Sequence, residues 1–318
     1  MKKEYIVLAL IIITLSAYLV FHKSDSTHYT LPVLEDLSNS DITRIDILHG
    51  TTPLTLEKNS DQWVVGDDKL PANTTMVTAM IKSIKDLKLT ALVSESKSYN
   101  RYELDEDNRI RVSAWSKDKM VRTVDVGKAA SSFKHTFVKL ETDPRVYHAE
   151  ENIRNIFNKT EDNLTDKGVL NVDSANVYQL QVTENGKTVS LVKKQEPVTV
   201  DVTQQKKKDE STEAPPAPEP KDTWTDASGK DKDLEKITGF VSLFSNLKCT
   251  NYIKGLAKDS LTDPILDVSI TGDKAYTLSV FAKKEGEKDY PAVSSESAFP
   301  FTLPEAKVDD IKKKFGEI

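Results

Sequence analysis

The sequence predicts an α+β fold with two tandem homologous domains, each a mainly antiparallel sheet with two packed helices, after an N-terminal transmembrane helix. Three observations lead to this fold class. They are an apolar run near the N-terminus, a segment of alternating apolar and polar residues that recurs 135 residues later, and two amphipathic helical segments that follow in matching order. The predicted domains are residues 41–165 and 166–318. A cytoplasmic tip and anchor at residues 1–22 and a juxtamembrane linker at residues 23–40 precede them.

The composition fits a folded chain with enough residues for two cores. The 318 residues include 44 basic and 50 acidic side chains, for a net charge of −6. Nucleic acid is not an expected partner, because binding to phosphates depends on a strongly basic surface. Cys249 is the only cysteine, so the chain can form neither an internal disulfide nor a thiolate zinc site, and the redox compartment stays open.

An uninterrupted apolar run extends from Tyr5 to Phe21 and follows Lys2 and Lys3. As a helix it would be about 25 Å long, which nearly crosses the core of a bilayer. A cleaved signal peptide is the main alternative, but its apolar region is usually shorter and ends in small residues. This run ends in large side chains, which favours an uncleaved anchor. The two lysines favour a cytoplasmic N-terminus, so everything after about His22 is expected outside the cytoplasm.

Two segments in which apolar and polar residues alternate predict β-hairpins. Residues 42–58 and 177–193 align without a gap at an offset of 177 − 42 = 135, and their apolar positions coincide. Each has a turn at its centre, and Asn185 followed by Gly186 is a strong hairpin signal. The same hairpin therefore opens each predicted domain.

Two further segments, residues 76–88 and 236–248, have apolar residues at helical spacing and end in Leu-Lys. A tryptophan precedes each at nearly the same distance, since 88 − 63 = 25 for Trp63 and 248 − 224 = 24 for Trp224. Because the tryptophans recur at one position of the repeat, we expect both to lie in a core and not on a binding platform.

Each amphipathic helix is followed by a predicted run of strands and a closing helix. The expected strands are residues 109–116, 121–127, 135–141 and 145–149 in the first domain, and residues 265–270, 275–282, 290–295 and 299–303 in the second. The closing helices are expected at residues 149–157 and 304–315. Regular βαβ alternation is missing, so the pattern favours antiparallel sheets with helices packed on one side.

The second domain contains an insertion. The offset between the copies is 135 at the hairpins and 224 − 63 = 161 at the tryptophans, so 161 − 135 = 26 extra residues lie between them. They correspond to the stretch rich in Pro, Lys and Glu at about residues 196–222, whose composition predicts disorder. A tolerated surface loop is the favoured interpretation. A Pro-rich arm that reaches a partner or spaces through peptidoglycan is the alternative.

Several short motifs follow one another in a recognisable order: "QWVV", "LPANTTMVTAMIKSIKDLK", "YELDED", "VDVGK" and "HTFVKLETDPRVYHAEENIRNIF". This order resembles the bacterial family catalogued as domain of unknown function 4340. The resemblance covers residues 41–170 well and residues 177–315 more loosely. Residues 102–107 depart from the family pattern because they lack its usual Gly and Pro, whereas residues 260–268 keep the Leu-x-x-Pro form.

The resemblance implies a membrane-anchored envelope protein of unassigned molecular role, in a family that often accompanies ABC transporter components of the gliding-motility type. It places the protein in the bacterial inner membrane as a single-pass protein with periplasmic C-terminal domains. The expected partners are the membrane, through Tyr5 to Phe21, and envelope proteins, with ABC transporter components among the candidates. No catalytic residues carry over from the family.

The residues themselves offer no catalytic signature, since Gly-x-Ser-x-Gly, P-loop, dinucleotide-binding and His-Glu-x-x-His motifs are all missing. Only His135 and His148 are expected to be close, and two imidazoles without a third ligand make a poor metal site. The acidic run at residues 103–108 lacks the glycine and spacing of a calcium loop and favours a solvated turn. Cys249 is interpreted as a small core residue. We expect no enzyme activity, no cofactor, and no catalytic, cofactor-binding or metal-binding residues.

Two functional hypotheses follow. The preferred one is a non-enzymatic envelope accessory or scaffold whose domains present sheet edges and faces to partner proteins. The alternative is a protein that binds a small molecule or a glycan, or hydrolyses one, at a site between the two repeats. A large exposed apolar patch would favour the first hypothesis, and a concave pocket with convergent polar groups would favour the second.

Overall fold

The computed structural model describes residues 3–21, 29–39, 41–196 and 221–318. The chain divides into two compact units: residues 1–63 with 73–164, and residues 64–72 with 165–318. The first helix, α1 (Lys3–Phe21), contains the apolar run of the predicted anchor. Within the described part of the chain, no helix is long and apolar enough to cross a membrane. The anchor therefore stays a prediction from the sequence.

A nine-stranded sheet has the order β4-β3-β2-β1-β6-β7-β8-β9-β5. Its strands are β1 (Arg44–His49), β2 (Thr52–Asn59), β3 (Gln62–Val65), β4 (Leu70–Pro71), β5 (Leu89–Ser94), β6 (Ile110–Ser116), β7 (Lys119–Ala129), β8 (His135–Leu140) and β9 (Asp143–Glu150). Alternation sets its two faces: Ile45 and Ile47 of β1 are buried, while Arg44 and Asp46 point to the opposite side. The edge strand β5, which pairs with β9, is a strand that the sequence pattern did not predict.

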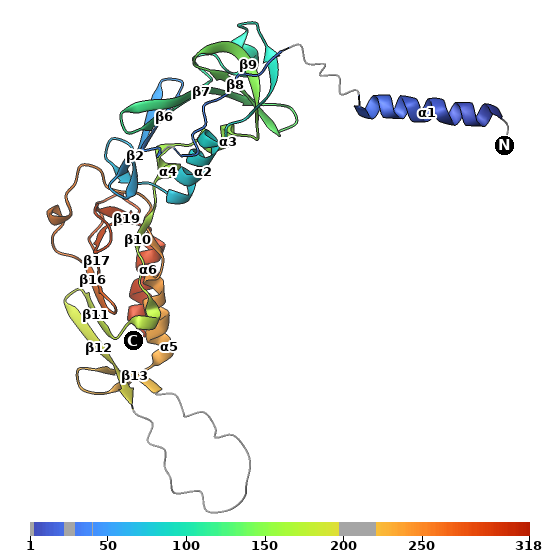
Figure 1. Cartoon of the computed structure of the whole chain (residues 1–318). Helices are drawn as coiled ribbons and strands as arrows, with labels where there is room; N and C mark the ends of the chain where they lie inside the picture. Colours follow the sequence, from blue (N-terminus) through green and yellow to red (C-terminus); the bar gives the residue numbers. More distant parts are fainter. Residues whose placement is uncertain (1–2, 22–28, 40, 197–220) are drawn as a thin grey trace, which may run out of the picture. The chain divides into compact units, whose positions relative to one another are not determined.

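The helices of the first unit cover the buried face of this sheet, where α3 (Arg154–Phe157) contacts β6 and β7 (Figure 1). Helix α2 (Thr74–Lys85) starts at Asn73, whose side chain accepts a hydrogen bond from the Met76 amide at 3.1 Å. Its apolar stripe is buried at Val77, Met80 and Ile84, as predicted. A further short helix, α4 (Glu161–Leu164), and a 3₁₀ turn, η1 (Tyr99–Tyr102), complete the unit.

The predicted closing helix at residues 149–157 is wrong in its first half. Strand β9 continues to Glu150, because its backbone pairs with both β8 and β5 up to Ala149. Glu151 then adopts a left-handed conformation with φ = 68°, which ends the strand and prevents an immediate helix. Helical structure begins only at Arg154.

The last part of the predicted juxtamembrane linker packs on the first unit. Leu37 is only 1% exposed. The Arg122 guanidinium donates to the backbone carbonyl of Glu35 and to the carbonyls of Ile84 and Lys85 at the end of α2. Arg122 therefore ties this segment to the C-terminal end of α2, where unpaired carbonyls and the helix dipole favour a cation. Burial lowers the pKa of Arg122, with Glu35 and Asp36 acting in the opposite direction.

The second unit contains an eight-stranded sheet in the order β14-β13-β12-β11-β16-β17-β18-β19. These strands are β11 (Gln179–Glu184), β12 (Lys187–Glu196), β13 (Lys221–Asp226), β14 (Asp231–Lys232), β16 (Leu266–Thr271), β17 (Ala275–Val280), β18 (Tyr290–Ser294) and β19 (Phe301–Leu303). A separate two-stranded sheet joins β10 (Gly168–Leu170) and β15 (Leu247–Lys248). The short 3₁₀ turns are η2 (Ser174–Asn176), η4 (Ser242–Phe244) and η5 (Lys258–Ser260).

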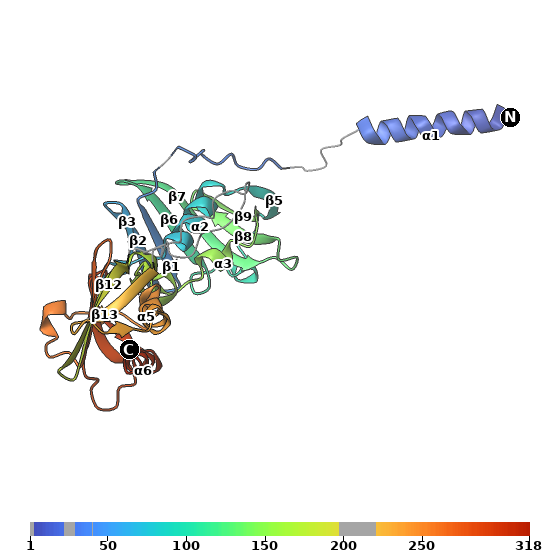
Figure 2. The same cartoon turned by 90° about the horizontal axis from the view of Figure 1, so that it is seen from below.

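Helices α5 (Leu234–Val241) and α6 (Glu305–Phe315) lie side by side along one side of the second sheet (Figure 1 and Figure 2). The ring centroids of Phe240 and Phe315 are 6.4 Å apart, so the two helices share an aromatic contact. Asp233 begins α5 and accepts a hydrogen bond from the Glu235 amide at 2.9 Å. Helix α6 confirms the predicted closing helix of this half.

The two large sheets have the same strand order once β5 is set aside, with β11 to β14 in the places of β1 to β4 and β16 to β19 in the places of β6 to β9. The register agrees as well. Ile45 pairs with Leu56 and Leu180 pairs with Leu191, and both residues differ by 135 between the pairs. The mixed fold with mostly antiparallel sheets, predicted from the sequence, is therefore confirmed.

The two tryptophans differ in burial. Trp224 on β13 is 3% exposed and belongs to the core, as predicted. Trp63 on β3 is only half-buried, so the predicted core role is wrong for this copy. In β3 the fully buried position is Val65, two residues further on, which lies on the same face of the strand as Trp63.

The predicted insertion at about residues 196–222 lies mostly outside the described residues. On either side of it, β12 and β13 pair antiparallel, and Glu196 opposes Lys221. The inserted residues therefore leave and re-enter a single sheet between neighbouring strands.

Candidate functional site

The residues considered as metal ligands lie together as a pair. His135 on β8 and His148 on β9 stack with ring centroids 5.4 Å apart, which confirms that they are close. Burial lowers the pKa of His148, and the neighbouring His135 lowers it further. In the described ranges, no group of three or more His, Cys, Asp or Glu side chains is placed to hold a metal ion.

The acidic run at residues 103–108 forms a turn that the buried side chain of Leu104 holds against the core. The Asn108 amide donates to the Asp105 carboxylate at 2.7 Å, while Leu104 is fully buried. Glu103 is left-handed, with φ = 54°. This is the place where the resemblance expects a glycine, and the left-handed backbone explains that preference. Cys249 is 7% exposed, which confirms that it is a core residue.

The outer face of the first sheet carries a network of charges around Asp125, which is 1% exposed. Its carboxylate accepts hydrogen bonds from Arg111 Nε at 2.7 Å and Arg109 Nη1 at 3.4 Å, and Lys139 Nζ lies at 2.7 Å. Burial raises the pKa of Asp125, but the hydrogen bonds from Arg111 and Lys139 outweigh it and lower the pKa overall. Sequence reasoning missed this cluster because its members come from three strands.

A second group of polar residues lies further along the same face. The Trp115 indole donates to the Asp46 carboxylate at 2.7 Å, and the Arg44 guanidinium stacks 4.1 Å from the Trp115 ring centroid. Arg44 also contacts Asp46 at 3.1 Å. The charged side chains on this outer face are therefore paired with one another, a pattern that holds the sheet together.

The outer face of the second sheet is different, because it is almost uncharged. On the central strands β11, β16 and β17 it presents nine residues, none of them buried: Gln179, Gln181, Thr183, Asp267, Ser269, Thr271, Ala275, Thr277 and Ser279. The only charge is Asp267, which accepts a hydrogen bond from the Ser279 hydroxyl. In a chain with 30% charged residues, a face that is made mostly of hydroxyl and amide side chains and has a single charge is a candidate recognition surface.

Each unit contains a pocket that is lined by both apolar and charged side chains. In the second unit, a pocket of about 650 Å³ is walled by Ile253, Leu256, Leu261 and Pro291, with Lys284, Glu287, Lys288 and Asp289 among its other lining residues. Its size lies in the range of small-molecule sites.

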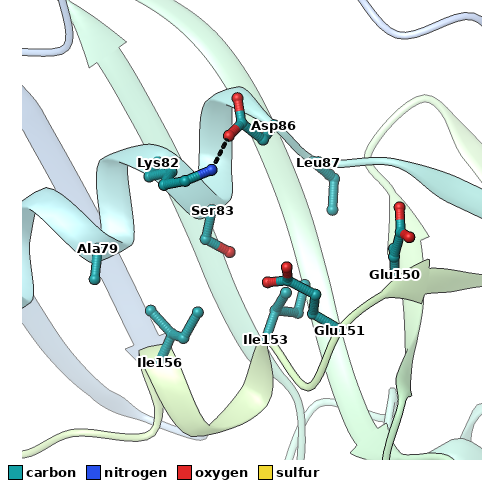
Figure 3. Close-up of a pocket in the computed structure, with 9 residues that line it drawn as sticks. All are labelled: Ala79, Lys82, Ser83, Asp86, Leu87, Glu150, Glu151, Ile153 and Ile156. Atoms are coloured by element: carbon teal, nitrogen blue, oxygen red, sulfur yellow. Dashed lines mark hydrogen bonds and ion pairs between the residues drawn. The ribbon is translucent and has the colours of Figure 1, made fainter.

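The second pocket lies in the first unit and has a volume of about 260 Å³ (Figure 3). Helix α2 contributes one wall, and the chain from the end of β9 to α3 contributes the other. Its lining residues are Ala79, Lys82, Ser83, Asp86, Leu87, Glu150, Glu151, Ile153 and Ile156. The pocket therefore combines an apolar wall with three carboxylates and one ammonium group.

Two of these carboxylates already have partners. Lys82 pairs with Asp86 one turn along α2, and Lys88 Nζ lies 3.3 Å from Glu150. The hydrogen bond with Asp86 raises the pKa of Lys82, and Glu151 adds a smaller effect in the same direction. The Glu151 carboxylate makes no hydrogen bond or ion pair with any described residue. Figure 3 shows it reaching back toward α2, on the side of the Ser83 hydroxyl.

Ser83 was not singled out from the sequence, because the helical pattern marks only the apolar positions of α2. Its Oγ atom is withdrawn from water and has no hydrogen-bond partner among the described residues. A serine inside a helix commonly bonds a carbonyl one turn earlier, so a buried hydroxyl without a partner is unusual. Ser83 and Glu151 are 151 − 83 = 68 residues apart, and their proximity could not be read from any local motif.

These features define a class of protein with mixed α and β structure, two mostly antiparallel sheets, and polar surfaces and small pockets within each unit. The chain belongs to the family described as a domain of unknown function (DUF4340), whose model matches residues 63–267. The matched region includes residues of both units. No curated protein and no solved structure matches the chain.

Proposed function

We propose that this protein is a non-enzymatic, membrane-anchored accessory or scaffold protein of the bacterial envelope, and that the outer face of its second sheet docks a partner protein. The observation that carries the proposal is the neutral face on β11, β16 and β17 described above. Hydroxyl and amide groups cost less to remove from water than charges do, and they can both donate and accept hydrogen bonds. Such a face suits recognition better than catalysis.

The outer faces of the two sheets differ in a way that supports a docking role for the second one. Where the first sheet has Arg44 and Asp46 on β1, the second has Gln179 and Gln181 on β11, at the same offset of 135. The charged face satisfies its own groups, as the contacts of Asp46 and Asp125 illustrate. The second face has fewer such contacts, namely the hydrogen bond of Ser279 with Asp267 and that of Thr183 with Thr188. The exposed side chains of Gln179, Gln181 and Thr277 make no hydrogen bond with any described residue and are available to a partner.

The tandem-repeat interpretation belongs to the same proposal. Equal strand order, equal hairpin register and an Asn or Asp at the start of each amphipathic helix support descent from one duplicated unit. The caps Asn73 and Asp233 differ by 160 residues, and so do the buried residues Met80 and Phe240. The duplication would have left two sheets free to specialise, one for stability and one for binding.

The docking role can be tested with photo-crosslinking residues placed at Gln181 and Thr277 in cells that produce the full chain. The proposed partner is an envelope protein, with subunits of an ABC transporter as the expected class. Lys313, an exposed residue of α6, provides the control position. We expect one transporter subunit to be captured at both face positions and not at Lys313. Equal capture at all three positions, or none at the face, would contradict the proposal.

The anchor is tested separately on isolated membranes. If residues 5–21 form an uncleaved anchor, the protein stays in the pellet after alkaline carbonate extraction, and mass spectrometry finds Lys2 and Lys3 in the mature chain. Recovery in the soluble fraction, with a chain that starts after Phe21, would instead identify a cleaved signal peptide. Loss of the anchor would leave the docking proposal for the second sheet intact.

The pocket of about 650 Å³ in the second unit supports a second candidate function, the binding of a small molecule. Its apolar residues Ile253, Leu256 and Leu261 would contact the body of the ligand. Native mass spectrometry of the purified full chain tests this function. A retained small molecule that is lost when Leu256→Arg blocks the wall would favour it, and a chain without any bound molecule would count against it.

A further inference from the structure

The charged side chains around the small pocket of the first unit favour a ligand with a positive charge. Of the four charged side chains that line it, Lys82 and Asp86 neutralise each other, and Glu150 is neutralised by Lys88. Glu151, an exposed residue, is left without an ion pair among the described residues. A ligand with a single positive charge would complete the set, whereas an anion would meet net repulsion.

The backbone holds Glu151 in a costly position. Its φ of 68° is left-handed, a conformation that costs a residue with a side chain roughly 1–2 kcal/mol. The Thr136 side chain on β8 helps to keep it there, because its hydroxyl donates a hydrogen bond to the Glu151 carbonyl at 2.9 Å. This turn places Glu151 among the lining residues of the pocket, and Figure 3 shows its carboxylate facing α2.

The apolar lining residues on both sides of the pocket add a second requirement for the ligand. Ala79, Leu87, Ile153 and Ile156 offer hydrocarbon surface and no hydrogen-bonding side-chain group. A cation such as a metal ion or ammonium would leave this surface unused, so the ligand should have an aliphatic part as well. The volume of about 260 Å³ is below that of most drug-sized sites and suits a single side chain or a small amine.

The buried hydroxyl of Ser83, on the α2 side of the pocket, is a further group that a ligand can contact. An unpaired buried hydroxyl typically costs about 1–3 kcal/mol. A ligand that donates a hydrogen bond to this oxygen would remove part of that cost. An ammonium group has three donors, enough to reach both Ser83 Oγ and Glu151.

We propose that this pocket binds a primary ammonium group on a short aliphatic stem, with Glu151 as the charge partner, Ser83 as a second acceptor, and Ile153 and Ile156 as the contact for the stem. Two sources can supply this chemistry: the side chain of a lysine on a partner protein, or a free alkylamine. The proposal does not depend on the docking role of the second sheet.

The experiment uses the full chain in lipid nanodiscs with the isoleucine δ1 methyl groups labelled with ¹³C. The methyl groups of Ile153 and Ile156 report on the pocket, and Ile237, buried in the second unit, serves as the reference. n-Pentylamine is the probe, and n-pentanol is the neutral molecule with the same stem. We expect pentylamine, and not pentanol, to shift the two pocket methyls with a dissociation constant in the millimolar range, while Ile237 stays unchanged.

Two variants separate the role of Glu151 from a general effect of charge. Glu151→Gln keeps the size of the side chain and should weaken pentylamine binding about five-fold, as expected for one partly exposed charge pair. Glu150→Gln is the matched control: it removes a carboxylate from the adjacent residue, but that carboxylate is paired with Lys88. It should change the dissociation constant less than two-fold. An unchanged methyl spectrum away from the pocket shows that both variants fold.

Nα-acetyl-lysine N-methylamide distinguishes the two sources. If it shifts the Ile153 and Ile156 methyls at least as strongly as pentylamine, the pocket receives a lysine side chain of a partner. If it is excluded while pentylamine binds, the ligand is a free amine. The proposal is overturned if neither compound shifts the pocket methyls, if pentanol binds as well as pentylamine, or if Glu151→Gln leaves binding unchanged.

Discussion

The carbonyl oxygen of Tyr102 occupies the position where Gly127 would carry a side chain. A Cβ atom added at Gly127 would overlap that oxygen and would also lie 3.0 Å from Cγ of Leu104. Strand β7 therefore needs a glycine here so that the turn after η1 can close against the sheet. The "VDVGK" motif, noted in the sequence as part of a family pattern, has this steric origin.

Gly127→Ala should lower the free energy of unfolding of the first unit by about 3 kcal/mol, because backbone and not a pliable side chain blocks the new methyl group. Urea unfolding followed by circular dichroism measures it. Gly239→Ala is the matched control, since its Cβ would only touch the Lys314 Nζ at 3.6 Å inside helix α5. It should raise stability by about 0.5–1 kcal/mol. Equal effects of the two substitutions would refute the steric explanation.

Asp125→Asn should destabilise the first unit by roughly 3 kcal/mol at pH 7, because Arg111 and Lys139 lose a buried counter-charge. The pKa of Asp125 is lowered in the folded protein. Its charge therefore stabilises the fold above the unfolded value of about 3.9, and this contribution is lost as the pH falls through the folded pKa. The gap between wild type and variant should hold from pH 7 to about pH 4 and shrink below it.

The same denaturation series with Asp118→Asn checks the assignment. Asp118 is exposed in the turn between β6 and β7, and its substitution should change stability by less than about 0.5 kcal/mol. A gap between wild type and Asp125→Asn that is independent of pH down to pH 2 would show that the carboxylate charge is not the cause.

Glu103 offers a test of backbone strain. Its φ of 54° should favour glycine over alanine by about 1 kcal/mol. Glu103→Gly and Glu103→Ala both lose the ion pair with Arg154 Nη2 at 3.3 Å, so the difference between the two variants isolates the backbone effect. Thermal unfolding should rank Glu103→Gly above Glu103→Ala. The reverse order would mean that this turn is not left-handed in solution.

Leu37 tests whether the segment before the first sheet is part of the fold. Leu37→Ala should cost about 2–4 kcal/mol, because the side chain is almost fully buried. Val33→Ala, four residues earlier at a position that is 97% exposed, should change stability by less than about 0.5 kcal/mol. Limited proteolysis should cleave near residue 37 faster in the Leu37 variant alone. Similar cleavage in both variants would identify the segment as a free linker.

The sequence was sufficient where a local pattern decides the structure. Alternation in residues 42–58 and 177–193 predicted both hairpins, and their register in the structure is the one that the gap-free alignment implies. Helix α2 was predicted from the spacing of Val77, Met80 and Ile84 and is capped by Asn73. Residues 149–157 failed as a helix because pairing with β5 and β8, which is non-local, extended β9 to Glu150.

The candidate sites were beyond such patterns. The pocket of the first unit depends on Ser83 and Glu151, and the charge network depends on Asp125, Arg111 and Lys139, which three strands bring together. Glu150 and Glu151 are equivalent in the sequence, and only the partner Lys88 and the left-handed turn distinguish them.

The amino-acid sequence by itself determined the class of fold, the two hairpins and the family, because alternation, helical spacing and turn residues act over a few neighbours. Tertiary structure alone decided which polar groups are paired and which are left open. Trp224 is buried and Trp63 is only half-buried, and one sheet face is charged while the corresponding face of the other sheet is almost uncharged. Burial and pairing depend on residues that are distant in the chain and meet only after folding.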